Sequence, residues 1–213
     1  MIKTLMKRTL LLMISGLMIA CGASGQVLYQ VDHYDQKYKK SLIRLALYVE
    51  AQSDAHTEQL LQLWGIQTQR YINQHRDFLL KEIAGSEIPK DIDFQALNSK
   101  SEDIKELCVP EIQGVIYLKG KVLPQDQKMK LSMQSELYDC EKQNKLWVAK
   151  IDDIWESKDQ TVESVIKMYE NEIGKEVYLY IAPSFHAIRL LFEQLPYPKM
   201  TLDRDIKDKI EMR

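Results

Sequence analysis

Residues 116–151 read IYLKGKVLPQDQKMKLSMQSELYDCEKQNKLWVAKI, and this stretch decides the fold. Apolar residues alternate with polar ones through 116–122 and again through 129–137, which is the period of strands with one buried face. The polar runs PQDQ and EKQN are typical of turns, and the second of them precedes an apolar strand at 146–151. The stretch therefore predicts a three-stranded antiparallel meander.

Upstream of the meander, the sequence predicts a further strand and a long helix. Residues 42–49, LIRLALYV, form a mostly apolar run that fits a strand buried on both faces. Ser53 or Asp54 can cap the helix that follows, whose apolar face repeats at helical spacing. The residues with this spacing are Leu60, Leu61, Trp64, Thr68, Tyr71 and Ile72. The run 78–80 fits either a second strand or the last turns of this helix.

The remaining segments are expected to be mainly helical. A polar connection over 85–100 leads to a short helix that ends near Cys108. After the meander, apolar residues at helical spacing predict one helix stopped by Gly174 and a second helix, after which the prolines of 196–198 end the structure. This order favours one layered α/β (α+β) domain over 41–213. Its mixed sheet would carry a C-terminal meander packed by the long N-terminal helix and paired C-terminal helices.

The first 20 residues have the layout of a secretory signal. Basic residues precede a nearly uncharged run that is too short to span a bilayer. Residues 17–21, LMIAC, resemble the lipobox of bacterial lipoproteins, in which the cysteine is acylated and becomes the mature N-terminus. We therefore predict a signal peptide over 1–20, a lipid anchor at Cys21 and a tether over 21–40. The alternative is an ordinary signal peptide with a chance cysteine.

Composition and charge limit the classes of protein to which the rest of the chain can belong. Hydrophobic residues make up 45% and charged residues 28%, which fits one compact domain rather than a disordered tail. The formal net charge is −2, so the sequence lacks the basic footprint that nucleic-acid binding needs. Gly22, in place of an Asp after the anchor, resembles an outer-membrane sorting signal. We expect an outer-membrane lipoprotein whose domain lies in the periplasm or at the cell surface.

Two cysteines remain after the anchor, Cys108 and Cys140. An even number of cysteines in an oxidising compartment favours a disulfide over a redox or metal pair. Cys140 is expected at the end of the middle strand of the meander, placed to reach Cys108 at the rim of the sheet. Two separate buried thiols are the alternative, because sequence alone does not show that the two residues meet.

Several short motifs follow one another along the chain. They are LWG at 63–65, RYINQHRDF at 70–78, WESKD at 155–159, YENEIG at 169–174, YIAPSF at 180–185 and LPYP at 195–198. Their order, with the two cysteines, resembles an uncharacterised bacterial lipoprotein family found in myxobacteria and leptospires. The resemblance implies a lipoprotein and transfers no activity. The helix and strands are also similar to the periplasmic α/β domains of outer-membrane assembly lipoproteins, an analogy of fold alone.

Candidate catalytic groups are few in this sequence. The histidines are His33, His56, His75 and His186. Their spacing matches no zinc motif. Ser184 lies two residues before His186 but lacks the Gly-x-Ser-x-Gly turn of a nucleophile, and it fits a helix start better. The acids Asp152, Asp153, Glu156 and Asp159 could bind a cation or perform acid/base catalysis, although a solvated strand end and a helix N-terminus also explain them. We predict no catalytic residue, metal site or cofactor.

The sequence therefore predicts a non-catalytic, membrane-tethered interaction or scaffolding module for an envelope protein partner. The partner is expected at the open sheet face or an uncapped sheet edge, with Tyr138 or Trp155 at the contact surface. The alternatives are a small envelope hydrolase and an auxiliary lipoprotein of a lipid or solute transporter. A deep pocket holding the acids of 152–159 with His186 would favour the hydrolase, and an apolar cavity between helices and sheet would favour the transporter component.

Overall fold

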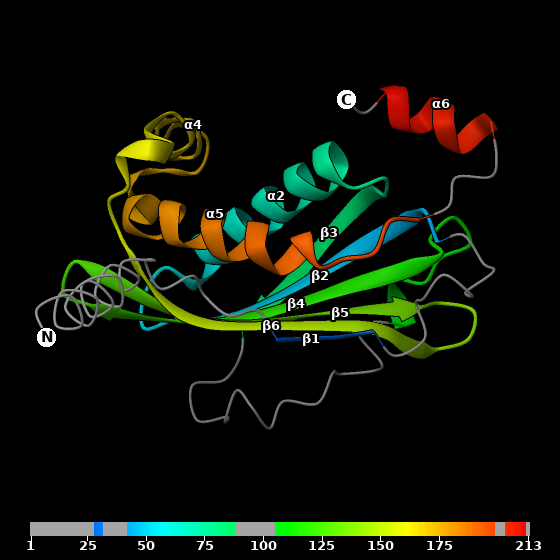
Figure 1. The fold of residues 1–213 in the computed structure, drawn as a ribbon, viewed down its shortest axis with the longest axis horizontal. Coiled ribbons are helices and arrows are strands. Elements are labelled where there is room, and N and C mark those ends of the chain that lie inside the picture. Colours follow the sequence, from blue (N-terminus) through cyan, green and yellow to red (C-terminus); the bar gives the residue numbers. More distant parts are fainter. Residues whose placement is uncertain (1–27, 32–41, 88–104, 199–202, 212–213) are drawn as a thin grey trace, which may run out of the picture.

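The structure, a computed structural model, describes residues 28–31, 42–87, 105–198 and 203–211 (Figure 1). The predicted signal peptide, the anchor at Cys21 and most of the predicted tether lie outside the described residues. Within the described ranges, no helix has both the length and the hydropathy needed to cross a bilayer.

Six strands form one mixed sheet in the order β1-β6-β5-β4-β2-β3. The strands are β1 (Leu28–Val31), β2 (Arg44–Gln52), β3 (Leu79–Glu87), β4 (Gly114–Gln125), β5 (Lys128–Asp139) and β6 (Asn144–Glu156). The helices are α2 (Thr57–His75), α4 (Glu163–Ile173), α5 (Tyr178–Glu193) and α6 (Asp203–Glu211), with 3-10 turns η2 (Gln160–Val162) and η3 (Lys175–Val177). Strand β2 is parallel to β3 and β4, and the other pairs are antiparallel. The predicted α+β class and the meander β4-β5-β6 are confirmed.

Helices α2 and α5 lie on one face of the sheet, which we call the helix-covered face (Figure 1). Helix α4 packs against α2 and α5 rather than directly on the strands. Strand β2 is buried on both faces along its whole length, as its apolar run predicted. The chain returns from β2 through α2 to the parallel neighbour β3, which forms a strand–helix–strand unit.

Two tryptophans fill the space between the helices and the sheet. Trp64 of α2 and Trp147 of β6 are both fully buried. Trp64 lies so close to Gly120 of β4 that a Cβ added there would be 2.5 Å from the indole ring. Trp147 stacks on Phe192 of α5 with 6.0 Å between ring centroids. This packing fixes the distance between both helices and the meander.

Hydrogen bonds from polar side chains join the C-terminal end of α2 to β3 and α5. Asn73 donates from Nδ2 to the carbonyl of Leu80, and its Oδ1 accepts the Leu80 N–H at 2.8 Å. Arg76 donates from Nε to the carbonyl of Phe192 at 2.9 Å, at the end of α5. A cation at this position satisfies carbonyl groups that the helix itself leaves unpaired. The motif at 70–78 thus joins α2, β3 and α5.

Helix α6 lies beyond the prolines of 196–198, where the sequence analysis expected the structure to end. This expectation is wrong because, among the described side chains of α6, the buried cation of Lys209 makes the attachment, while Ile206 and Ile210 are exposed. Lys209 donates from Nζ to the carbonyls of Asn73 and Arg76 at 2.6 Å and of Phe78 at 2.7 Å. Hydrophobic spacing does not reveal such an attachment.

The chain enters the sheet earlier than expected. Residues Leu28–Val31, inside the predicted tether over 21–40, form β1 and pair with Trp147–Lys150 of β6. A strand of this length depends on pairing with a longer neighbour, so its own pattern gives little signal. The expected tether therefore contains an ordered strand.

Other boundaries around α2 also differ from the expectation. The run 78–80 proves to be the start of β3, which continues to Glu87 and so takes the first residues of the predicted polar connection. His56, in the left-handed conformation at φ 59°, precedes α2 in place of a capping Ser53 or Asp54. Of the short helix expected before Cys108, residues 101–104 lie outside the described residues.

Candidate functional site

The structure separates the acids that the sequence groups together. Asp152 contacts Lys130 at 3.4 Å and accepts a hydrogen bond from Ser132 at 3.1 Å, whereas Glu156 contacts Lys128 at 2.8 Å. All these residues lie on β5 and β6. Asp159, beyond the end of β6, contacts a different element, and the four acids do not converge on one point.

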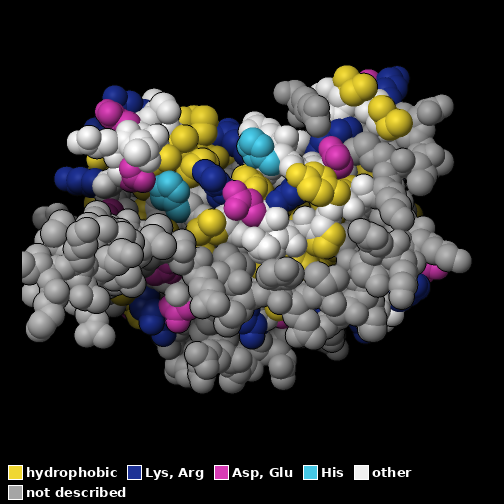
Figure 2. Space-filling view, viewed as in Figure 1, with side chains coloured by type: hydrophobic (Ala, Val, Ile, Leu, Met, Phe, Trp, Pro, Cys, Tyr) yellow, Lys and Arg dark blue, Asp and Glu magenta, His cyan; other side chains and the backbone are white. Residues whose placement is uncertain are grey.

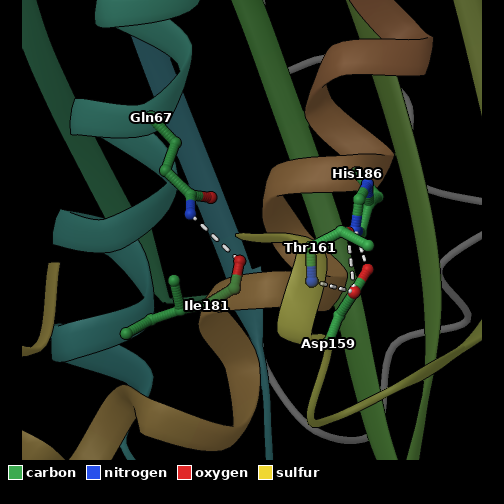
Figure 3. A network of polar contacts seen from close by, with 5 residues as sticks. All are labelled: Gln67, Asp159, Thr161, Ile181 and His186. Carbon is green, nitrogen blue, oxygen red and sulfur yellow. Dashed lines mark hydrogen bonds and ion pairs between the residues drawn. The ribbon is translucent and has the colours of Figure 1, made fainter. Parts of the chain in front are cut away.

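Asp159 pairs with His186 of α5 (Figure 3). The two side chains are 2.8 Å apart, and Asp159 Oδ1 also accepts the Thr161 hydroxyl at 2.7 Å and the Thr161 N–H at 2.8 Å. The bonds from Thr161, with a smaller contribution from His186, lower the pKa of Asp159. The carboxylate caps η2 and holds that turn against α5.

Ser184 does not complete a catalytic arrangement with this pair. Its hydroxyl accepts a hydrogen bond from Trp64 Nε1 at 2.8 Å, and the residue is almost fully buried. Gln67, one turn further along α2, donates to the carbonyl of Ile181 at 3.2 Å, as Figure 3 also shows. The polar groups at this contact thus join α2 to α5.

No group of three His, Cys, Asp or Glu side chains in the described part of the chain has the geometry to hold a metal ion. On the side shown in Figure 2, positive and negative side chains of the described residues are interspersed with apolar ones over the helices. Such a mixture produces no strong field of a single sign there.

A disulfide joins Cys108 to Cys140, the pair that the sequence singled out. Cys140 follows the end of β5, and both cysteines pack against a second apolar cluster on the sheet face opposite α2 and α5. Tyr138 belongs to this cluster and donates from its hydroxyl to Glu136. The structure therefore places this candidate partner-surface residue in partly buried packing beside the disulfide.

A buried polar cluster crosses the same opposite face, and sequence reasoning missed it. Glu50 of β2 accepts a hydrogen bond from the Tyr117 hydroxyl of β4 and another from Ser86 of β3 at 3.4 Å. Lys119 lies with its Nζ 5.5 Å from the centre of the Tyr117 ring. Glu136 of β5, also buried, extends the cluster towards β6. Burial raises the pKa of Tyr117 and lowers that of Lys119.

This cluster corrects the expectation that each strand of the meander has one exposed face. Strand β4 is buried on both faces over residues 114–120. Alternating apolar and polar residues show that one face of a strand is polar, but they do not show that this face is exposed to solvent. Tyrosine and lysine also fit a buried face when their polar ends have partners. Glu50, which directly continues the buried run 42–49, was the available signal.

At the far end of the meander, the opposite face carries exposed and half-buried side chains. We call this part of the face the distal sheet surface, and it consists of Lys121, Leu123, Lys128, Lys130, Asp152, Ile154 and Glu156. Leu123, Lys130 and Ile154 form one row across three strands, and Leu123 is 37% and Ile154 46% exposed. One ion pair of this surface, Lys128 with Glu156, lies beside the row, and the other joins Lys130 of the row to Asp152. Exposed apolar side chains between paired charges are typical of a protein contact surface.

Among the described residues, the outer edge of β6 has no strand partner beside this surface. Strand β1 covers that edge only at Trp147–Lys150, and no described strand pairs with the edge over 151–156. The N–H of Ile154 points away from β5 and donates to Asp153 Oδ1 at 2.8 Å. Trp155, half-buried against the helix-covered core, lies on the other face of the same edge. The second candidate partner-surface residue is therefore located at an uncapped edge.

No known protein family and no curated protein matches the sequence. The resemblance to the myxobacterial and leptospiral family accordingly stays a prediction.

Solved structures with a similar fold are distant. The chain is similar to PelC, solved as a dodecamer from Paraburkholderia phytofirmans, with 10% identity and a TM-score of 0.44 over 83% of this chain and 100% of that one. It is also similar to the hypothetical protein CT253 from Chlamydia trachomatis, with 9% identity and a TM-score of 0.35 over 68% of this chain and 98% of that one. For lipoprotein GNA1162 from Neisseria meningitidis, the identity is 10% and the TM-score 0.33 over 62% of this chain and 97% of that one. At these values, the similarities assign this chain neither a family nor a function.

Proposed function

We propose that this chain is a membrane-tethered, non-catalytic interaction module whose distal sheet surface contacts another envelope protein. The observation that carries the proposal is the row of Leu123, Lys130 and Ile154, with its exposed apolar ends, beside the edge of β6 that no described strand covers. The lipid anchor predicted at Cys21 would hold this surface near a membrane, where its partner would be found.

The charges of this surface support a protein partner. Two of its lysines are paired with carboxylates on the neighbouring strand, Lys128 with Glu156 and Lys130 with Asp152. Such pairs leave little net charge to attract an anionic lipid layer or a nucleic acid. Exposed apolar side chains next to paired charges are instead the combination found in protein interfaces.

The two alternatives lack comparable support. A hydrolase built on Ser184 and His186 would need the serine hydroxyl to face the histidine, but this hydroxyl is bonded to Trp64. A transporter component would need an apolar cavity between the helices and the sheet, where Trp64, Trp147 and Phe192 are packed.

The proposal can be tested by mild crosslinking in cells, followed by mass spectrometry of proteins recovered with the tagged full-length chain. We expect an envelope partner to be recovered with the wild type and lost with Leu123→Lys/Ile154→Lys, because two lysines would replace the two exposed apolar side chains of the row. A matched control is Met168→Lys/Leu179→Lys, which changes two similarly exposed apolar residues of the helical layer.

The anchor is tested in the same experiment with Cys21→Ala, which should also lose the partner. Equal recovery of the partner by the wild type and the Leu123→Lys/Ile154→Lys variant would contradict the proposed contact surface. Loss of the partner in the Met168→Lys/Leu179→Lys control alone would assign the contact to the helices instead.

A further inference from the structure

The open edge of β6 has the geometry to accept an additional strand. The register of β5 and β6 places Lys128 opposite Glu156, Lys130 opposite Ile154 and Ser132 opposite Asp152. Because Ile154 has its N–H on the outer edge, the backbone groups of every second residue, 152, 154 and 156, face outwards there. Strand β1 pairs with the same edge of β6 as far as Lys150, which lies opposite Leu28, the first described residue of β1.

The side chains of this edge specify what kind of strand fits. Asp152, Ile154 and Glu156 point to the distal sheet surface and would stand beside successive same-face residues of an added strand. Lys128 and Lys130 contact one oxygen of Glu156 and Asp152 from the β5 side. Because each carboxylate has a second oxygen, the two acids with the apolar residue between them match a strand with the pattern basic-x-apolar-x-basic. Since the pattern is symmetric about Ile154, parallel and antiparallel addition fit equally well.

The same charges disfavour pairing with a second copy of this edge. An antiparallel pair of two β6 edges centred on Ile154 would place Asp152 of one copy opposite Glu156 of the other at both ends. Like charges directly opposite one another destabilise a strand pair. Asp153, which accepts the outward N–H of Ile154, further protects the empty edge against unselective pairing.

We infer that the outer edge of β6 at Asp152–Glu156 binds an extended segment of a partner protein with the pattern basic-x-apolar-x-basic, by strand addition. This inference rests on the proposed function and names the partner segment that the function requires. Binding would release the Ile154 N–H from Asp153 to a carbonyl of the partner. Trp155 would then lie against the opposite face of the added strand.

The test uses two fluorescent peptides and the full-length chain in detergent micelles. One peptide has the core Lys-Thr-Ile-Thr-Lys and the other has Glu in both Lys positions, and binding is measured by fluorescence anisotropy. We expect the wild type to bind the Lys peptide about tenfold more tightly, because two favourable cross-strand charge pairs replace two unfavourable ones. The preference should weaken as salt is added.

Two variants make the test specific to this edge. Asp152→Lys/Glu156→Lys should reverse the preference, and Asp152→Asn/Glu156→Gln, which introduces no lysine repulsion, should abolish it. Circular dichroism melting of each variant checks that the fold is kept. Equal binding of both peptides by the wild type, or binding of neither, would overturn strand addition. In-cell crosslinking of the wild type and of Leu123→Lys/Ile154→Lys would still report on the proposed function, so the two failures are distinguishable.

Discussion

The two ends of β6 differ in how they are used. Near its start, Trp147 is fully buried against α5, and β1 covers the outer edge of the strand. Near its end, Ile154 is exposed, Trp155 is half-buried, and no described strand covers the outer edge. One continuous strand thus contributes to the core at one end and to the surface at the other. The difference indicates that the first end contributes more to stability, whereas the second end carries the contact surface that we propose.

Alanine substitutions of the two tryptophans of β6 test this separation most strongly. Trp147→Ala should lower the free energy of unfolding by about 3–5 kcal/mol, since it leaves a large cavity and removes the hydrogen bond to the Gln194 carbonyl. Trp155→Ala should lower the free energy of unfolding by about 1–2 kcal/mol, because less of the Trp155 side chain than of Trp147 is buried. Urea denaturation measures both. Equal losses would contradict the difference between the two ends.

Loss of the disulfide should have the next largest effect on the free energy of unfolding. Cys108 and Cys140 close a loop with a sequence separation of 32, so Cys108→Ser/Cys140→Ser should lower the free energy of unfolding by about 3–4 kcal/mol. Denaturation with and without a reductant measures the effect. The reductant should destabilise the wild type and leave the double variant unchanged; an equal response of both proteins would argue against the bond.

The buried polar cluster gives a smaller effect. Tyr117→Phe removes the hydroxyl that donates to the buried Glu50, which should cost about 1.5–3 kcal/mol because the carboxylate loses a partner. Tyr48→Phe is a matched control on the neighbouring strand, since the Tyr48 hydroxyl bonds to the uncharged Ser86 at 2.9 Å. Tyr48→Phe should lower the free energy of unfolding by less than Tyr117→Phe does, as measured by chemical denaturation. A larger loss for Tyr48→Phe would contradict a stabilising bond between Tyr117 and Glu50.

The Asp159 cap should contribute least, and its effect depends on pH. Because Thr161 and His186 lower the pKa of Asp159 in the folded chain, the carboxylate stabilises the fold above the pKa of an unfolded Asp, about 4. This stabilisation is lost as pH falls through the lower folded pKa. Asp159→Asn should therefore lower the free energy of unfolding by less than about 1 kcal/mol at pH 7, and by progressively less as the pH falls below about 4. Thermal melting from pH 2 to 7 measures the difference, and a pH-independent cost would contradict the lowered pKa.

Sequence patterns predicted the elements whose burial follows a simple period. The meander, the doubly buried β2 and the helices ended by His75 and Ile173 each bury a long apolar set, so the pattern and the structure agree. The motifs at 63–65, 70–78 and 180–185 prove to include core contacts. Trp64 bonds to Ser184, and Arg76 bonds to the end of α5.

The parts that sequence did not predict depend on contacts between distant residues. Strand β1 needs β6 to form, and α6 is attached through Lys209 to carbonyl groups of α2. The buried pairing of Glu50 with Tyr117 joins residues 67 positions apart. The distal sheet surface was only partly predictable, because the alternation showed which residues share a face but not which end of that face is exposed.

Site-specific photocrosslinking in cells tests most directly whether the distal sheet surface is the contact surface. A photoreactive residue would replace Ile154 in one full-length protein and Met168 in another, two positions with similar exposure, 46% and 43%. We predict a discrete adduct with an envelope protein from position 154 and no such adduct from position 168. An adduct from position 168 alone, or the same adduct in equal yield from both, would contradict a contact surface at the distal end of the sheet.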